Sequence, residues 1–501
     1  MVGIVIDQFG SQTLNRYLPY LDGRGLIKRM ISRGAYFEHT HLPYAATFTA
    51  PGHAAIYTGR LPRDNGIAAN RVWNPGLGRW LSVVDDRTHA VFGAPDQFAG
   101  PMAMRAPTLG DLLKQSTKGH ARVVSLSLKP WPATVSAGKS PDMVAWYHAG
   151  DGQGRMTTSS YYGKVLPAWL TSWSTAHPVQ KYLTVWSARD PALLRRVLGE
   201  DIKPGESLVH GWSASMPHDP LASPSPAEAF LFTPPSVQYL LDAALAAVEH
   251  YRMGTDHVSD LLMLSVSTTD IVGHAFGNAS WEYLDVLVRT DRMLGDFIDN
   301  LSQRIQLAVL VTSDHGVGPM PEQSQSLSAE RLTSDELLTE LRRAAYAGMG
   351  PGAWIDSCDG PFVAFGKDAE APPTRRVLVQ ALQKGLASDP RIFGLYDLWS
   401  LKDLATPPVD LWGTAVWKSA PPNPVADLYV LSNRDVVLRQ GLGTTHGTPW
   451  DYDSEVPTLI YAPGIKSRRQ SSAVEMTQLA PTIAKLLGIA PPVRGVRSLL
   501  P

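Results

Sequence analysis

The stretch Thr47-Phe48-Thr49-Ala50-Pro51-Gly52-His53 decides how the rest of the chain is interpreted. It predicts the start of a helix, because Thr49 is a favourable N-cap and Pro51 falls in the first turn, where a missing N–H costs nothing. A hydroxyl at this place faces unpaired N–H groups and the positive end of the helix dipole, which suits an anion and an ionising nucleophile. Taken alone, the stretch favours the simpler interpretation that Thr49 only caps a helix, and the rest of the chain changes that balance.

Size and composition exclude several classes of protein. The 501 residues can bury a large core, and 45 Lys and Arg against 46 Asp and Glu argue against nucleic acid as a bulk partner. Cys358 is the only cysteine, which excludes an intrachain disulfide and a cysteine-rich zinc site. No run of about 18 apolar residues occurs, so we expect no membrane span.

Continuous apolar runs at residues 2–6, 261–267 and 307–313 are typical of strands buried on both faces of a parallel sheet. Segments with helical spacing lie between them, and this alternation predicts an α/β fold. We expect a doubly wound, mostly parallel sheet with helices on both faces. The chain is interpreted as a single domain over residues 1–501, with irregular cap insertions at about 120–215 and about 340–440.

The first apolar run starts directly after Met1 and is interpreted as a core strand, not as the apolar region of a signal peptide. We therefore expect a cytoplasmic protein if this N-terminus is genuine, and otherwise a chain that has lost its leader.

Carboxylates and imidazoles follow the buried strands, at the edge where open α/β sheets bind ligands. They are Asp7, Asp270, His274, Asp314, His315 and, near the end of the chain, His446. Asp270 and His274 share one face if their segment is helical, and both residue types suit zinc. Each of these residues, taken alone, has a simpler structural explanation; Asp7, for example, is equally suited to cap a helix. Together with Thr49 they match a centre in which two metals about 4 Å apart clamp the attacking and leaving oxygens of an in-line displacement.

Two other polar residues are candidates for binding an anion. Asn70 closes the predicted loop Gly66–Asn70 and has an amide that can donate, although Asn in a loop is usually a turn residue. Lys129 follows a strand predicted at residues 123–128, and composition alone favours a surface lysine there.

Over nearly its whole length the sequence resembles the alkaline phosphatase superfamily. The resemblance is strongest to bacterial alkaline phosphatases with a threonine nucleophile, which share a core with nucleotide pyrophosphatases/phosphodiesterases. Six motifs in the right order carry it, namely Val5–Phe9, Thr49–His53, Gly66–Asn70, Thr269–His274, Ser313–Gly316 and His446–Pro449.

The resemblance implies two zinc ions per chain and a set of residues around them. One zinc ion would be held by Asp270, His274 and His446, and the other by Asp7, Asp314, His315 and the Thr49 oxygen. The resemblance also implies that Asn70 donates to a phosphoryl oxygen, that Lys129 binds the phosphoryl group, and that His53 is structural support.

One departure from the family pattern follows Lys129. The monoesterase branch has Lys-Asp-Arg there, whereas this chain has Lys129-Pro130-Trp131. A tryptophan cannot supply the bidentate contacts of an arginine, but it can stack on a base or an aryl leaving group. Arg155 is one arginine that would be able to supply the missing contacts to the phosphoryl group if it reaches the site.

We therefore predict an alkaline phosphatase that hydrolyses phosphate monoesters with zinc through a phosphothreonine intermediate. The alternative is a phosphodiesterase or nucleotide pyrophosphatase on the same two-metal core, which Trp131 favours. A relative that only binds phosphorylated ligands is disfavoured by the complete ligand set, and a sulfatase by the threonine at position 49. We expect small-molecule phosphate esters as substrates, a monomer, and, from the resemblance, a periplasmic or secreted location.

Overall fold

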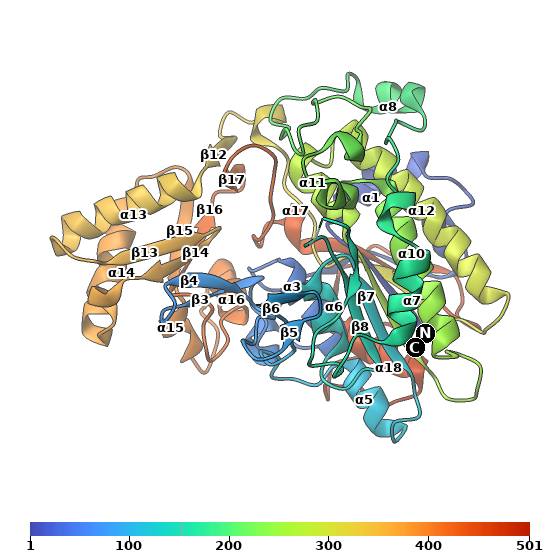
Figure 1. Cartoon of the computed structure of the whole chain (residues 1–501). Coiled ribbons are helices and arrows are strands. Elements are labelled where there is room, and N and C mark those ends of the chain that lie inside the picture. The colour runs from blue at the N-terminus through green and yellow to red at the C-terminus, as the bar shows by residue number, and fades with distance from the viewer. Residues whose placement is uncertain (151, 501) are drawn as a thin grey trace.

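The computed structural model of the chain describes residues 1–150 and 152–500. A ten-stranded central sheet organises its main body (Figure 1). From edge to edge the strands are β19 (Arg468–Gln470), β2 (Ala35–His41), β18 (Glu455–Tyr461), β11 (Val309–Thr312), β1 (Val2–Ile6), β10 (Leu261–Val266), β7 (Val123–Ser127), β8 (Met143–His148) and β9 (Arg155–Thr157), with β20 (Val474–Glu475) paired to β2.

β1 lies in the middle of this sheet and is parallel to both of its neighbours. Val2 pairs with Leu262 of β10 on one side and with Val309 of β11 on the other. β7 and β8 continue the parallel arrangement, while β18 runs antiparallel to β11 and β2. All residues of β1 are buried, as its continuous apolar run predicts for a strand covered on both faces.

Helices cover both faces of the sheet, which confirms the predicted fold class. Successive side chains of β1 point into different cores, Ile4 into one and Val5 into the other. The first core is closed by α1 (Ser11–Tyr17), α2 (Leu26–Arg33), α10 (Pro234–His250) and α12 (Trp281–Ser302). The second is closed by α3 (Thr49–Thr58), α5 (Leu109–Ser116), α6 (Pro130–Ala137) and α18 (Leu479–Leu487).

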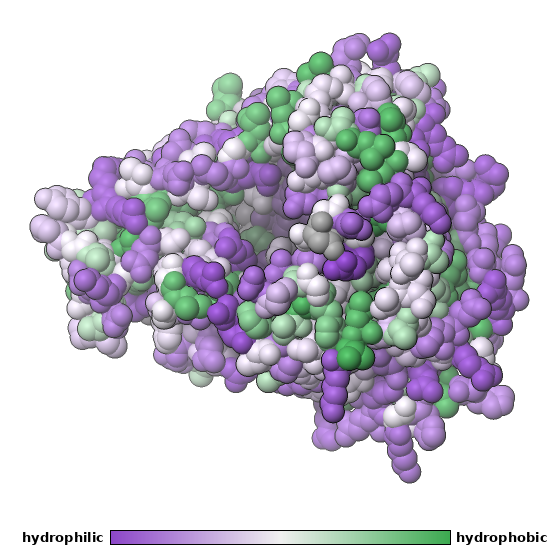
Figure 2. All heavy atoms as spheres, viewed as in Figure 1, coloured by the Kyte–Doolittle hydropathy of each residue, from purple (hydrophilic) through white to green (hydrophobic). Residues whose placement is uncertain are grey.

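A smaller lobe with its own core projects from the main body, on the left of Figure 1. Its sheet consists of β13 (Ile355–Asp359), β14 (Phe362–Phe365), β16 (Leu428–Ser432) and β15 (Ile392–Asp397), covered by α13 (Ser334–Met349) and α14 (Pro372–Leu386). This lobe falls within the second predicted insertion. Figure 2 shows the surface hollowed between the lobe and the main body, with mostly hydrophilic residues around the hollow.

The first predicted insertion contains β7 and β8, which are strands of the central sheet. After β9 the chain forms α7 (Ala168–Ala176), α8 (Pro191–Leu198) and the short α9 (Pro226–Ala229), which contribute to the first core. The division into one domain with two caps stays a prediction. No helix among the described residues is long and apolar enough to cross a membrane.

The remaining α-helices and β-strands are short. They are α4 (Pro62–Asn65), β3 (Arg71–Asn74), β4 (Arg79–Ser82), β5 (Ala90–Val91), β6 (Ala94–Phe98), α11 (Thr268–Phe276), β12 (Glu330–Leu332), α15 (Leu398–Lys402), α16 (Leu411–Lys418), β17 (Val436–Leu438) and α17 (Asp451–Ser454).

Candidate metal centre and nucleophile

The carboxyl ends of β1, β10 and β11 bring most of the predicted ligands together. Asp7 follows β1, the pair Asp314-His315 follows β11, and Asp270 and His274 lie one turn apart on α11, directly after β10. Asp7, Asp314 and His315 are completely buried. His446 joins them from the loop between β17 and α17.

Two groups of ligand atoms have the spacing that a metal ion requires. Asp7, Asp314 and His315 form one group, and Asp270, His315 and His446 form the other, with the atoms of each group within 4.8 Å of one another. His315 belongs to both groups, a grouping that differs from the predicted one, in which His274 completes the second set. His274 Nε2 lies 3.2 Å from Asp270 Oδ1 and therefore borders the second group.

Each of the three histidines is oriented by its Nδ1 atom, which lies within hydrogen-bond distance of a backbone carbonyl. The acceptors are Thr444 for His274 at 2.8 Å, Thr47 for His446 at 2.8 Å and Gly316 for His315 at 3.0 Å. A carbonyl can only accept, so these bonds assign the ring proton to Nδ1 and leave Nε2 with its lone pair facing the carboxylates. This is how metal-ligating histidines are commonly held in proteins.

Within the described part of the chain, the buried carboxylates have oxygens without a hydrogen-bond partner, which a bound cation would satisfy. Asp7 Oδ1 and Asp314 Oδ2 have no hydrogen-bond partner among the described residues. His315 Nε2 is 3.4 Å from Asp7 Oδ1 but carries no proton, and His53 Nδ1, 3.3 Å from Asp314 Oδ2, lies closer to Thr49 O, at 2.9 Å. Burial lowers the pKa of His315 to about 3, so its imidazole stays neutral. The residues therefore fit a divalent metal such as zinc.

Lys129 lies between the two groups. Its Nζ donates to Asp7 Oδ2 at 3.0 Å and also to Asp270 Oδ2. Burial alone would lower the pKa of Lys129, but the charges of Asp270 and Asp7 raise it above its usual value. Burial and the charges of Asp270 and Asp314 raise the pKa of Asp7. Burial would also raise the pKa of Asp270, but His274 and Lys129 hold it well below its usual range.

Thr49 is the first residue of α3 and Phe48 is the N-cap, which corrects the expectation that Thr49 caps the helix. The Thr49 hydroxyl makes no cap hydrogen bond and lies 3.4 Å from His315 Nε2. Capping comes from another loop, because Asn70 Oδ1 accepts a hydrogen bond of 2.8 Å from Ala50 N. That bond also directs Asn70 Nδ2 away from the helix, without a partner among the described residues.

Gln8 lies in the Val5–Phe9 motif, but nothing in the sequence indicates a role for it. Its Nε2 donates to Asp270 Oδ1 at 2.8 Å, and its backbone N donates to Asp314 Oδ1 at 3.2 Å. The backbone of Gln8 has a φ of 64°, an uncommon conformation for which glutamine gives no signal. A Cβ on Gly273 would lie 1.8 Å from Gln8 Oε1, which explains why a glycine stands between Asp270 and His274.

Neither Trp131 nor Arg155 supplies a cation beside the ligand groups. The indole Nε1 of Trp131 donates to Ser82 Oγ at 2.7 Å, and its ring packs against the second core. Arg155 lies on the edge strand β9. Its guanidinium packs against Gly93, since a Cβ added to Gly93 would lie 2.4 Å from it.

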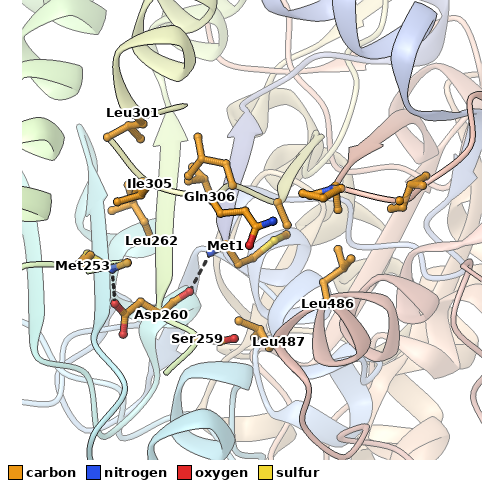
Figure 3. A pocket seen from close by; sticks show the side chains of 18 of the residues that line it. Met1, Met253, Ser259, Asp260, Leu262, Leu301, Ile305, Gln306, Leu486 and Leu487 are labelled. Atoms are coloured by element: carbon orange, nitrogen blue, oxygen red, sulfur yellow. Dashed lines mark hydrogen bonds between the residues drawn. The ribbon is translucent and has the colours of Figure 1, made fainter. Parts of the chain in front are cut away.

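A cavity of about 1100 Å³ lies at the opposite end of the sheet and is separate from this centre. Figure 3 shows Met1, Leu262, Leu301 and Leu487 around it, with Met1 N donating to Asp260 O at 3.0 Å. These residues lie at the amino ends of the parallel strands, whereas α/β sheets bind ligands at the carboxyl ends.

Comparison with known proteins supports the interpretation from the ligand groups. Alkaline phosphatase PafA of Elizabethkingia meningoseptica is 28% identical over 99% of this chain and 92% of its own length. Alkaline phosphatase PhoV of Synechococcus elongatus is 27% identical over 98% of this chain and 90% of its own length.

A crystal structure of wild-type alkaline phosphatase PafA superimposes with a TM-score of 0.90 at 26% identity and covers 99% of this chain and 97% of the PafA chain. A family model described as type I phosphodiesterase / nucleotide pyrophosphatase matches residues 1–364, which include every predicted site residue except His446. The chain therefore belongs to the type I phosphodiesterase / nucleotide pyrophosphatase family of the alkaline phosphatase superfamily and is a phosphoric ester hydrolase.

Proposed function

We propose that this protein is an alkaline phosphatase that hydrolyses phosphate monoesters with Thr49 as the nucleophile and two zinc ions as cofactors. The observation that carries the proposal is the place of the Thr49 hydroxyl, which lies at a helix N-terminus and 3.4 Å from the histidine shared by both ligand groups. One zinc ion would be held by Asp7, Asp314, His315 and the Thr49 oxygen, and the other by Asp270, His274 and His446. Bound zinc would supply positive charge that stabilises the attacking and leaving oxygens.

The protein's own groups bind and orient the phosphoryl group. Asn70 Nδ2 donates to one phosphoryl oxygen, and Lys129 supplies the positive charge that a monoester dianion requires. Thr49 Oγ gives up its proton to solvent water as it attacks phosphorus, the bond from phosphorus to the leaving oxygen breaks, and that oxygen takes a proton from water, so that the leaving group departs as an alcohol. Water then attacks phosphorus, which releases inorganic phosphate and restores the Thr49 hydroxyl.

Hydrolysis of phosphodiesters is the second candidate function. The matched family model is described as type I phosphodiesterase / nucleotide pyrophosphatase, and Trp131 stands where the monoesterase branch has an arginine. Lys129 favours the monoester, because a monoester carries one more negative charge than a diester and the ammonium group lies between the two ligand groups.

The two functions separate in one experiment. The protein is stripped with a chelator and zinc is restored, and kcat/KM is measured for 4-nitrophenyl phosphate and for methyl 4-nitrophenyl phosphate. We expect activity to return with zinc and the monoester to be the better substrate, with Thr49→Ala as the inactive control. A higher kcat/KM for the diester would make this protein a phosphodiesterase, and full activity with fewer than one bound transition metal would contradict the two-zinc proposal.

The remaining proposals concern the setting of the reaction. The substrates are small phosphate esters, because nothing in the charge balance of the chain favours a polyanion. We also propose that the protein works as a monomer in the periplasm or outside the cell, as the family resemblance implies.

A further inference from the structure

The ligand groups are open to solvent mainly at His274. Its side chain is 25% exposed, against 3% for Asp270, 3% for His446 and 0% for His315. A substrate therefore approaches the centre past His274, and groups beside this imidazole meet the part of the substrate that remains outside.

Arg439 is the cation at this entrance. It directly follows β17, and its Nη1 lies 3.4 Å from His274 Nδ1. That contact is not a hydrogen bond, because His274 Nδ1 already donates its proton to Thr444 O and cannot accept. The only acceptor of Arg439 among the described residues is then Leu442 O, 2.8 Å from Nε, and the outer N–H groups have none.

No carboxylate among the described residues forms an ion pair with Arg439. The nearby Arg331 is different, because Glu322 accepts two hydrogen bonds from its Nη2, both at 2.8 Å, and Gly443 O accepts one from Nη1. Burial and the charge of Arg331 lower the pKa of Arg439, while Asp270 acts in the opposite direction. Arg439 is thus a partly buried cation without a counter-ion.

The loop that carries Arg439 is fixed, so the guanidinium is held at the entrance. Gly443 N donates to Gly205 O at 2.7 Å, and Thr444 N donates to His274 O at 3.0 Å. A Cβ on Gly443 would lie 2.1 Å from His274 O, so the loop packs directly on the end of α11.

We propose that Arg439 forms an anion subsite for the leaving group, and that preferred substrates are phosphate monoesters whose leaving group carries a carboxylate or a second phosphate. The inference rests on the proposed function. In an in-line displacement the leaving group departs on the side opposite Thr49, and the proposed function assigns that side to Asp270, His274 and His446. A second negative charge on that group lies within reach of the unpaired guanidinium.

The test compares aryl phosphates whose leaving groups either carry or lack a second negative charge. Phenyl phosphate is compared with 3-carboxyphenyl phosphate, 4-carboxyphenyl phosphate and 1,3-phenylene bisphosphate, in wild type and in Arg439→Gln, Arg439→Lys and Arg331→Gln. A charge-assisted hydrogen bond is worth ~10- to 100-fold in kcat/KM. We expect wild type to prefer at least one charged substrate by about tenfold or more, Arg439→Gln to lose that preference, and Arg439→Lys to keep part of it.

Arg331→Gln is the control for a structural role of this loop, because it removes a paired arginine and its bond to Gly443 O but keeps the Arg439 guanidinium, and it should leave the ratio between substrates unchanged. The carboxylate and bisphosphate arms show which anion the subsite takes. No preference in wild type, or an equal loss for all substrates in Arg439→Gln, would overturn the inference and leave Arg439 with a structural role. Failure of wild type to hydrolyse any of the four would overturn the proposed monoesterase function as well.

Discussion

At the scale of single residues, the candidate nucleophile depends on a side chain from another loop. The N-cap residue Phe48 has no side chain that can accept from Ala50 N, and Asn70 accepts this hydrogen bond instead, so the Thr49 hydroxyl takes no part in holding α3. The stability of α3 therefore depends on Asn70 and the attack on the substrate on Thr49, so substitutions should affect the two properties separately.

We expect Thr49→Ala to lose at least 1000-fold in kcat for 4-nitrophenyl phosphate, because no other hydroxyl replaces the nucleophile. Thr49→Ser should keep part of the activity. The free energy of unfolding should change by less than about 1 kcal/mol, since the residue makes no cap bond. Steady-state kinetics and urea unfolding measure both quantities, and a near wild-type rate in Thr49→Ala would mean that water attacks the substrate directly.

The side chain of Asn70 has two functions: Oδ1 accepts the capping hydrogen bond from Ala50 N, and Nδ2 is the proposed donor to the phosphoryl group. Two variants distinguish these functions. Asn70→Asp keeps the acceptor for Ala50 N but loses the donor, so we expect wild-type stability with kcat/KM reduced by ~10- to 100-fold. Asn70→Ala loses both and should also unfold more easily by ~1 kcal/mol. Equal stability of the two variants in urea would show that the bond to Ala50 does not stabilise α3.

At the scale of elements, Asp270 and His274 share one face of a helix because α11 begins directly after β10 and includes both residues. Close contact between this helix and Gln8, the second residue after β1, sets the position of Asp270. Gly273 allows that contact, and Gln8 fills the space a side chain would take.

Gly273→Ala should therefore weaken metal binding although the substitution is chemically small. Its Cβ would displace the Gln8 amide, whose Nε2 holds Asp270 Oδ1 at 2.8 Å. Loss of such a supporting hydrogen bond typically costs 10–100-fold in metal affinity, and competition with a chelator measures it. Gly23→Ala is the control, because nothing lies within 4 Å of that position. Equal zinc affinity in the two variants would contradict this account of Gln8.

The sequence predicts the strands β1, β7, β10 and β11 of the main sheet and the candidate ligand residues because these leave local patterns. The apolar run of β1, the helical spacing of α12 and the polar residues after the strands can each be read within a few positions. Contacts between distant segments leave no such pattern. The capping of α3 by Asn70, the sharing of His315 between both groups, and the unpaired Arg439 depend on packing across the whole fold.

At the scale of the whole molecule, a second cluster of buried titratable side chains lowers the stability of the fold at alkaline pH. His218 Nε2 lies 2.8 Å from Glu282 Oε1, and both side chains are completely buried. Burial, with the charges of Asp201 and Asp285, raises the pKa of Glu282 to about 8, and burial lowers the pKa of His218 to about 4. Burial also raises the pKa of Glu206 to about 8. In the folded protein His218, Glu282 and Glu206 are thus neutral between about pH 4 and about pH 8.

A carboxyl group with a raised pKa stabilises the fold fully below its unfolded value of 4.5 and loses that contribution as pH rises through about 8. We therefore expect Glu282→Gln, which cannot ionise, to be more stable than wild type by over ~1 kcal/mol at pH 9. At pH 6 the advantage should be smaller or reversed. Urea unfolding at both pH values gives the two differences, and an identical difference at pH 6 and pH 9 would exclude ionisation of Glu282 as the cause.

The central place of β1 also has a consequence for synthesis of the chain on the ribosome. β1 is made before the other strands of its sheet, but its partners β10 and β11 begin only at Leu261 and Val309. At ~5–20 residues per second, this apolar strand waits on the order of tens of seconds before it has a neighbour to pair with. During translation the nascent chain therefore exposes an unpaired hydrophobic edge, and we expect its yield to depend on chaperones that bind such segments until Val309–Thr312 has been made.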